Sequence, residues 1–290
     1  MPPLATKSPG RPPLLPPPTL VILSVISTQV GSAFAKTLFG QVGPLGIVFL
    51  RVGLGALILL VLWRPRPTAE ARRHWRSVAG FAIALTLMNS LFYLAIARIP
   101  LGIAVALEFT GPLGLAVFKS RRWMDGLWAT LAAMGVLLLA PLGAFSLDWV
   151  GIVLALAAGG CWAAYILMSA RVGQALPGVD GLTWAMALGA CLLAPIGISS
   201  AGAALLQPNI LLTATGVALM SSVLPYSFEL TALRTLPINV FGVLLSLEPM
   251  TATLAGMVIL GETLTVRAFL AVLLISTAAA GSACFQPRLK

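Results

Sequence analysis

The sequence predicts an all-α integral membrane protein with ten transmembrane helices in two inverted five-helix repeats. Three observations support this fold class. Hydrophobic residues make up 59% of the 290 residues, charged residues only 9%, and the mean hydropathy is +1.01, outside the range of soluble globular domains. Apolar runs of about 20 residues, the length that crosses a bilayer, recur along the chain. A pattern of prolines and acidic residues in the first half returns in the second half.

The apolar runs divide the chain into a tail and two halves. Residues 1–18 are rich in proline and carry two basic side chains, and we expect a disordered cytoplasmic tail there. The first half, residues 19–143, holds five apolar runs: 19–40, 44–63, 78–97, 100–118 and 124–142. The second half, residues 149–286, holds five more: 149–170, 179–199, 210–232, 237–260 and 266–284. Each run is predicted to be one transmembrane helix, and each half one repeat.

The first run has a polar face formed by Gln29, Ser32 and Lys36. An Ala-x-Ala motif at 33–35 leaves a cleaved signal peptide open as an alternative. Because the apolar character continues beyond Lys36, a retained helix is the favoured interpretation.

The repeat is visible in prolines and acidic residues at one constant offset of 137 residues, without a gap. The matched sets are Pro100, Pro112 and Asp125 in the first half and Pro237, Pro249 and Glu262 in the second. Asn89-Ser90 likewise corresponds to Tyr226-Ser227. Prolines and acids do recur at helix ends by chance, but a gapless register that also pairs two intramembrane acids favours a true repeat.

The basic residues predict the orientation of the chain. Fourteen of them fall on the side of the predicted membrane that holds the N-terminus, and only Arg98 and Arg267 fall on the other side. Because basic residues accumulate in cytoplasmic loops, both termini are predicted to be cytoplasmic. Five helices per half bring the second half into the membrane from the opposite side, so the repeats are inverted. Inverted repeats with interrupted helices and a midplane site are typical of secondary transporters.

The first candidate site residue is Glu108, which lies in the middle of an apolar run with Pro112 one turn later. A carboxylate at that depth costs about 2.5–3.5 kcal/mol, which disfavours an unpaired glutamate facing lipid. Pro112 has no N–H for the carbonyl of Glu108, so one helical turn holds a carboxylate and a freed acceptor. In the second half, Pro249 frees the carbonyl of Leu245, the repeat counterpart of Glu108, and Glu248 lies three residues further on, on an equivalent helix face.

Two intramembrane carboxylates predict a site that binds a substrate ammonium, a proton, or each in turn. A structural ion pair with Lys36 or Arg51 is the alternative. The further candidates for substrate binding or proton coupling are polar side chains in the apolar runs: Lys36, Arg51, Asn89, Tyr93, Tyr226 and Ser227. Hydrogen bonds between helices would explain the uncharged members of this set equally well. Helix breaks are predicted at Pro112, Pro225 and Pro249, and Glu229 with Arg234 is a candidate gate.

Several function classes are disfavoured by what the sequence lacks. His74 is the single histidine and the three cysteines have no metal-ligand spacing, so no metal or cofactor is expected. No phosphate-binding Walker motif is present, and no catalytic constellation lies in the apolar runs, so neither ATP-driven transport nor an enzyme is expected. The basic residues lie in separate loops and not on one face, so nucleic acid is not an expected partner.

Four segments carry a resemblance to a known family: GIAVALEFTGPLG (102–114), CWAAYIL (161–167), LPYSFELTAL (224–233) and LEPMTATLAGMVILGETLT (247–265). With them the chain resembles the drug/metabolite transporter superfamily, in its ten-helix form built from two EamA repeats, over about residues 19–286. Within that group the segments are similar to those of bacterial inner-membrane threonine and homoserine exporters. Lys36, Arg51 and Gly261-Glu262 resemble general EamA features, whereas Gln29 stands where many members carry tryptophan.

The resemblance implies a secondary active exporter of small neutral amino acids, namely threonine and homoserine, in the bacterial inner membrane. The two intramembrane glutamates add the expectation of proton antiport. A broader metabolite or drug exporter of the same fold is the alternative. The expected partners are small amino-acid substrates, protons and membrane lipid.

Overall fold

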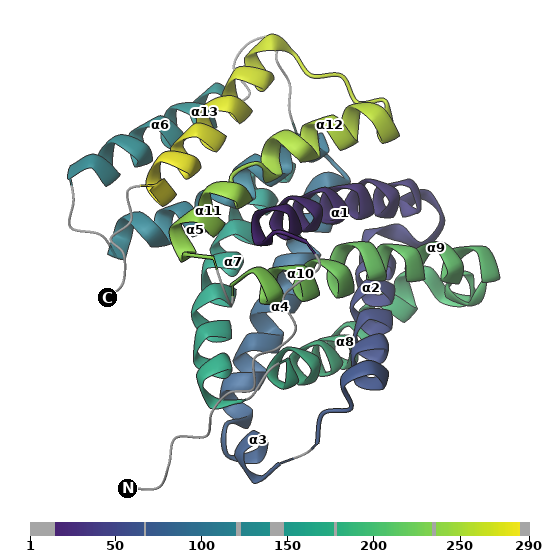
Figure 1. Ribbon diagram of the computed structural model, residues 1–290. Coiled ribbons are helices and arrows are strands. Elements are labelled where there is room, and N and C mark those ends of the chain that lie inside the picture. The colour runs from purple at the N-terminus through teal and green to yellow at the C-terminus, as the bar shows by residue number, and fades with distance from the viewer. Residues whose placement is uncertain are drawn as a thin grey trace, which may run out of the picture.

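The computed structural model of the chain describes residues 15–66, 68–119, 123–139, 148–176, 179–233 and 236–284, and within these ranges it is entirely helical (Figure 1). The helices of the first half are α1 (Pro17–Thr37), α2 (Phe39–Trp63), α3 (Ala69–Arg73), α4 (Trp75–Ile96), α5 (Leu101–Lys119) and α6 (Trp123–Leu139). Those of the second half are α7 (Trp149–Ala175), α8 (Asp180–Ala201), the 3₁₀ helix η1 (Gly202–Leu206), α9 (Pro208–Ala218), the π-helical turn η2 (Leu219–Val223), α10 (Leu224–Leu233), α11 (Ile238–Leu245), α12 (Glu248–Leu260) and α13 (Val266–Cys284).

Eight helical stretches in the described part of the chain are long and apolar enough to cross a membrane. Two shorter apolar stretches, Leu101–Leu115 and Gly126–Leu139, lie within the predicted runs 100–118 and 124–142. The predicted all-helical membrane fold is therefore confirmed. The count of ten spans and their inverted arrangement stay predictions.

The first two predicted runs are joined by a bend. α2 already begins at Phe39, and its path turns at Gly43, where φ is 69° and ψ is 163°. Pro44 disfavours helical geometry in the residue before it, and glycine adopts a positive φ without steric cost. A short helical segment, residues 39–42, precedes this break, and the longer helix then runs from Pro44, the predicted start of the second run, to Trp63. At the N-terminus, α1 begins at Pro17, inside the predicted tail, while residues 1–14 and the predicted repeat boundary at 143 lie outside the described residues.

The helices of each half pack mainly on helices of the other half. α4 packs on α7 and α8, α5 on α7, α2 on α8, and α6 on α13. α1 lies between α10 and α12, as Figure 1 shows. The apolar core therefore runs through both halves.

α5 and α7 meet backbone to backbone at Gly111 and Gly159. A Cβ atom added at Gly111 would meet the carbonyl of Gly159, and one added at Gly159 would meet the carbonyl of Glu108. Small residues let membrane helices approach this closely. The contact fixes α5 against α7 beside the predicted site residue Glu108.

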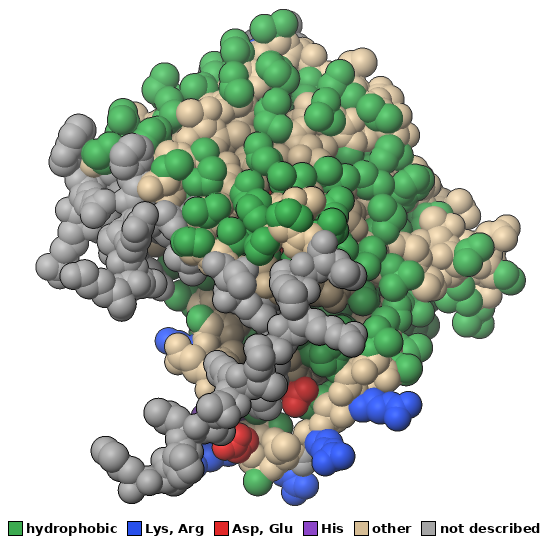
Figure 2. All heavy atoms as spheres, in the orientation of Figure 1, with side chains coloured by type: hydrophobic (Ala, Val, Ile, Leu, Met, Phe, Trp, Pro, Cys, Tyr) green, Lys and Arg blue, Asp and Glu red, His purple; other side chains and the backbone are tan. Residues whose placement is uncertain are grey.

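The surface fits an apolar surrounding over most of its extent. Figure 2 shows hydrophobic side chains across one face and Lys and Arg side chains gathered at the end that carries α3. The exposed charged residues of that segment are Arg64, Arg66, Glu70, Arg72, Arg73 and Arg76. Large side chains such as Leu57, Val61 and Leu62 are more than half exposed on α2, as expected for a helix that contacts lipid.

The glycine contact generates a first prediction. Gly159→Ala should lower the free energy of unfolding by about 1–3 kcal/mol, because the new methyl group meets backbone atoms of α5 that cannot move aside. Gly160→Ala is the matched control, because a Cβ at Gly160 meets nothing within 4 Å. Thermal unfolding in detergent measures both variants, and equal melting temperatures for the two would contradict the close approach of α5 and α7.

Candidate functional site

Arg51 is the centre of a buried polar cluster. It lies in α2 and is 7% exposed. Its Nη1 donates to the Tyr93 hydroxyl at 3.1 Å, its Nη2 to the Ser221 carbonyl at 2.8 Å, and its Nε to Ser222 Oγ at 3.3 Å. The guanidinium also lies 5.4 Å from the centre of the Tyr93 ring, within the range of a cation–π contact. All of these partners are uncharged.

One carboxylate lies within electrostatic range of this guanidinium, and two others follow it in series. Glu108 in α5 is 8% exposed and lies within electrostatic range of Arg51. Glu248, the first residue of α12, is within range of Glu108 and of Glu229 in α10. In the described ranges, no carboxylate comes within ion-pair distance of Arg51. The cluster therefore holds one cation, Arg51, and three glutamates, none of which forms an ion pair with it.

Two tyrosines connect the cluster to α7. Tyr226 in α10 is within electrostatic range of Arg51 and Glu229, and Tyr165 in α7 is within electrostatic range of Tyr226 and Glu229. Ser24 of α1 donates to Glu229 Oε1 at 2.6 Å. Polar groups in this region thus come from α1, α2, α4, α5, α7, η2, α10 and α12. Four of the residues that supply them were not predicted: Ser24, Tyr165, Ser221 and Ser222.

α5 continues through Pro112, so the prediction of a helix break at this residue is wrong. The proline removes only one N–H, and the carbonyl it leaves free, that of Glu108, faces Gly159 of α7. The lack of a side chain at Gly159 leaves room for that carbonyl. The freed acceptor is therefore part of the helix contact, while the Glu108 side chain belongs to the polar cluster.

The other two prolines lie at irregular backbone. Pro225 follows the π-helical turn at Leu219–Val223, a widened turn that is frequent at functional sites. This turn presents the Ser221 carbonyl to Arg51. Near Pro249 the chain is interrupted, because α11 ends at Leu245 and α12 begins at Glu248. Glu248 consequently lies at the N-terminus of α12, where unpaired N–H groups favour a negative charge.

The remaining predicted site residues have local partners. Asn89 is buried in α4 and donates to the Leu85 carbonyl, and Ser227 donates to the Val223 carbonyl. Both bonds stay within one helix, which is the commonest role of such residues. Arg234, the proposed gate partner of Glu229, lies outside the described residues.

Lys36 is held at the C-terminal end of α1 and not in the polar cluster around Arg51. Its Nζ lies 2.6 Å from Glu262 Oε1 and 3.1 Å from the Ile99 carbonyl. Glu262 Oε2 accepts a hydrogen bond from the Leu101 N–H at 2.8 Å, which caps the first turn of α5. The assignment of Lys36 to the substrate site is revised accordingly: it joins α1 to α5 through a carboxylate of the second half.

Two glycines place the Glu262 carboxylate. Gly261 ends α12 with φ 65°, a left-handed conformation that glycine tolerates, and the Glu262 N–H then bonds back to the Gly256 carbonyl at 3.1 Å. A Cβ added at Gly256 would meet the Glu262 carboxylate. The carboxylate therefore lies over α12 and reaches the start of α5.

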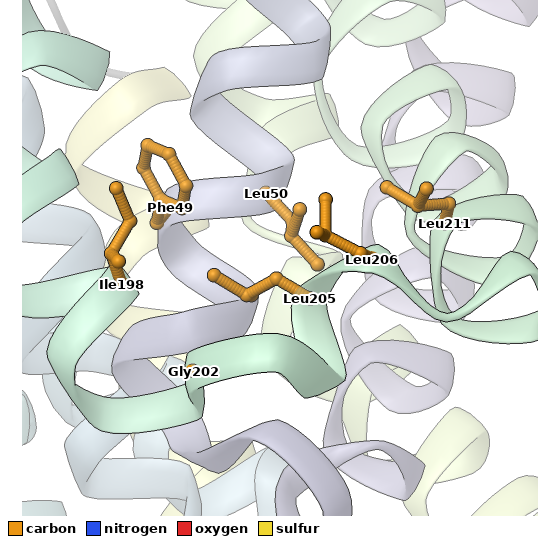
Figure 3. A pocket seen from close by; sticks show the side chains of 7 residues that line it. All are labelled: Phe49, Leu50, Ile198, Gly202, Leu205, Leu206 and Leu211. Carbon is orange, nitrogen blue, oxygen red and sulfur yellow. The ribbon is translucent and has the colours of Figure 1, made fainter.

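Hollows elsewhere in the molecule have the wrong chemistry for a charged substrate. The hollow in Figure 3 measures about 320 Å³ and is lined by Phe49, Leu50, Ile198, Gly202, Leu205, Leu206 and Leu211. A second, between α5 and α6, measures about 640 Å³ and has Thr110 as its polar lining residue. Neither hollow includes Arg51 or a glutamate, so neither offers a charged partner to a zwitterion. Within the described chain, no group of three His, Cys, Asp or Glu side chains could hold a metal ion.

A helical bundle that is apolar outside and carries charged groups in its interior defines a membrane protein that handles polar cargo. The EamA-like transporter family model matches residues 17–145 and 149–283, and the chain belongs to this family. The family prediction made from the sequence is confirmed.

The chain is similar to curated proteins over most of its length. Threonine/homoserine exporter RhtA of Salmonella typhimurium is 44% identical over 268 residues, which cover 91% of this chain and 90% of that protein. Threonine/homoserine exporter RhtA of Escherichia coli is 42% identical over 92% of this chain and 90% of that protein. A solved crystal structure shares the fold, with a TM-score of 0.63 at 19% identity, over 91% of this chain and 95% of its own.

The ion pair between Lys36 and Glu262 generates a second prediction. Glu262→Gln should lower the free energy of unfolding by about 1–3 kcal/mol, because Lys36 loses its anion in a site where the two side chains are only 21% and 13% exposed. Thermal unfolding in detergent at neutral pH measures the change.

The control is Arg98→Gln, which removes the exposed pair between Arg98 and Asp148. In that pair the guanidinium holds the pKa of the Asp148 carboxyl below its usual range, but both groups are open to water. A surface pair contributes little. A loss for Glu262→Gln no larger than that for Arg98→Gln would contradict the structural role of the Glu262 carboxylate.

Proposed function

We propose that this chain is a secondary active exporter of small neutral amino acids, with threonine and homoserine as substrates, that works by proton antiport. The observation that carries the proposal is the buried cluster in which Arg51 is held only by uncharged groups, with Glu108 within electrostatic range of both Arg51 and Glu248. A guanidinium with neutral partners retains the capacity to bind a carboxylate. The glutamates supply the opposite charge.

A zwitterionic amino acid fits this distribution of charge. Its carboxylate pairs with the guanidinium of Arg51, and its ammonium group with Glu108 or Glu248. Arg51 is positioned by Tyr93 and by the backbone of the π-helical turn, so it is ordered before substrate arrives. The relatives named threonine/homoserine exporter, at 42–44% identity, support the choice of substrates.

Proton coupling follows from competition for one carboxylate. In the described residues, neither Glu108 nor Glu248 has a hydrogen-bond donor or an ion-pair partner within the protein. A carboxylate that binds the ammonium group of the substrate cannot hold a proton at the same time. Export of substrate in exchange for protons requires such alternation.

The proposed architecture is two inverted repeats of five helices each, residues 19–143 and 149–286, after a tail of residues 1–18. Both termini lie in the cytoplasm and the protein resides in the bacterial inner membrane. The distribution of basic residues supports the orientation. The protein transports its substrate without converting it chemically, so its proposed function is not enzymatic.

The proposal is tested with purified protein in liposomes loaded with radiolabelled threonine or homoserine, with and without an imposed pH gradient. Wild type should show saturable efflux that the gradient accelerates. Glu108→Gln should lose the acceleration by the gradient, because the amide cannot take up a proton. Glu70→Gln, at an exposed glutamate of α3, is the matched control and should behave as wild type.

Each outcome separates one part of the proposal. Efflux of neither amino acid from folded wild-type protein would contradict the substrates and leave a broader metabolite or drug exporter. Gradient-driven efflux that persists in Glu108→Gln would exclude Glu108 from coupling and assign that role to Glu248.

A fourth prediction concerns the substrate carboxylate. Arg51→Lys should raise the KM for threonine by about 10- to 100-fold, because an ammonium group replaces a fork of donors that binds a carboxylate at two points. Arg72→Lys, at an exposed arginine of α3, is the control. An unchanged KM in correctly folded Arg51→Lys would show that the guanidinium does not contact the substrate.

A further inference from the structure

Gln29 in the middle of α1 has an amide oxygen that none of the described residues satisfies. The residue is 2% exposed. Its Oε1 atom is fully buried and has no hydrogen-bond partner among the described residues. A buried acceptor without a donor is unfavourable, so a donor from outside the protein is expected at this position.

The helix itself cannot supply that donor. Buried hydroxyl groups without a partner, such as those of Thr86 and Ser276, can rotate toward a carbonyl of their own helix. An amide oxygen needs an N–H or O–H, and the backbone N–H groups in the middle of α1 are already bonded along the helix. The Gln29 oxygen therefore requires a group that is not part of α1.

Gln29 lies at the depth of Glu108. It is seven residues, or two turns, inward from Lys36 on the same face of α1, and Glu108 is seven residues inward from Leu101 on α5. Lys36 and Leu101 both bind the Glu262 carboxylate, so the two helices are tied together at one level. Seven residues of helix correspond to about 10.5 Å from that level in each case.

The backbone of α1 beside Gln29 is linked to the arginine of the cluster through Ser221. The carbonyl of the adjacent residue Thr28 accepts a hydrogen bond from Ser221 Oγ at 3.5 Å, and the Ser221 carbonyl binds Arg51. α12, which begins at Glu248, packs on both α1 and α5. Gln29 thus lies on a helix that packs against the π-helical turn next to Arg51 and against α12, which carries Glu248.

We propose that the Gln29 amide oxygen accepts a hydrogen bond from the side-chain hydroxyl of the substrate and so selects hydroxylated amino acids over apolar ones of the same shape. This rests on the proposed function, in which the substrate carboxylate and ammonium group bind Arg51 and the glutamates. The hydroxyl is then the one donor on the side chain of threonine or homoserine. A site built to bind a hydroxyl rejects an analogue that lacks it, because the protein group is left unpaired.

The test compares threonine with valine, in which a methyl group replaces the hydroxyl, and homoserine with norvaline for the same reason. In the liposome assay, wild type should prefer each hydroxylated member at least about tenfold in kcat/KM. Gln29→Met, which keeps the length of the side chain and removes the acceptor, should bring both ratios close to one. Gln41→Met, at an exposed glutamine of α2, should leave them unchanged.

A second variant tests the same contact through distance. Gln29→Asn withdraws the oxygen by one methylene, so the longer side chain of homoserine should be favoured over threonine relative to wild type. Size-exclusion chromatography establishes that each variant is folded, and if Gln29→Met is not, Gln29→Asn decides.

Wild type that exports threonine and valine equally would overturn the role of Gln29 and leave the proposed function intact. So would ratios that stay unchanged in the folded Gln29 variants, or equal loss of all four substrates. Wild type that exports none of them would contradict the proposed function itself.

Discussion

A guanidinium in an apolar interior must have acceptors, and the burial of Arg51 imposes that requirement on the helices around it. Tyr93 of α4 and the π-helical turn meet it directly, and Ser221 of that turn also contacts α1. Apolar membrane helices have little hydrophobic reason to choose one register over another. These few polar contacts therefore determine how α1, α2, α4 and α10 face one another, and the apolar side chains then pack around that arrangement.

The charged members of the cluster could be predicted because an ionisable residue inside an apolar run is rare and costly. That signal identified Arg51, Glu108 and Glu248, and the structure places Glu108 within electrostatic range of each of the other two. It gave no information on partners, so Lys36 was assigned to the same site although Glu262 holds it elsewhere. Ser221, Ser222 and Tyr165 carried no signal, because hydroxyl groups in helices commonly bond to their own backbone. The π-helical turn, which places the Ser221 carbonyl on Arg51, has no sequence pattern of its own.

The two halves were visible in the sequence as similar units, but their packing was not. Most large helix contacts join one half to the other, including the backbone contact of Gly111 with Gly159. The sequence shows that glycines are present and does not show which of them face each other. Because the polar side chains come from both halves, neither half alone would bring Arg51 together with Glu229 and Glu248.

The ion pair between Lys36 and Glu262 also has a consequence for the order in which the molecule is made. The two residues are 226 positions apart, and a ribosome that adds roughly 5–20 residues per second needs on the order of 10–45 s to cover that distance. During this interval α1 is in the membrane with an ammonium group that has no anion, and its long side chain must reach water at the interface. During the same interval the first turn of α5 lacks the Glu262 carboxylate that accepts its Leu101 N–H. The first helix therefore reaches its final position only when almost the whole chain has been synthesised. A chain that stops before Glu262 lacks the carboxylate that joins α1 to α5.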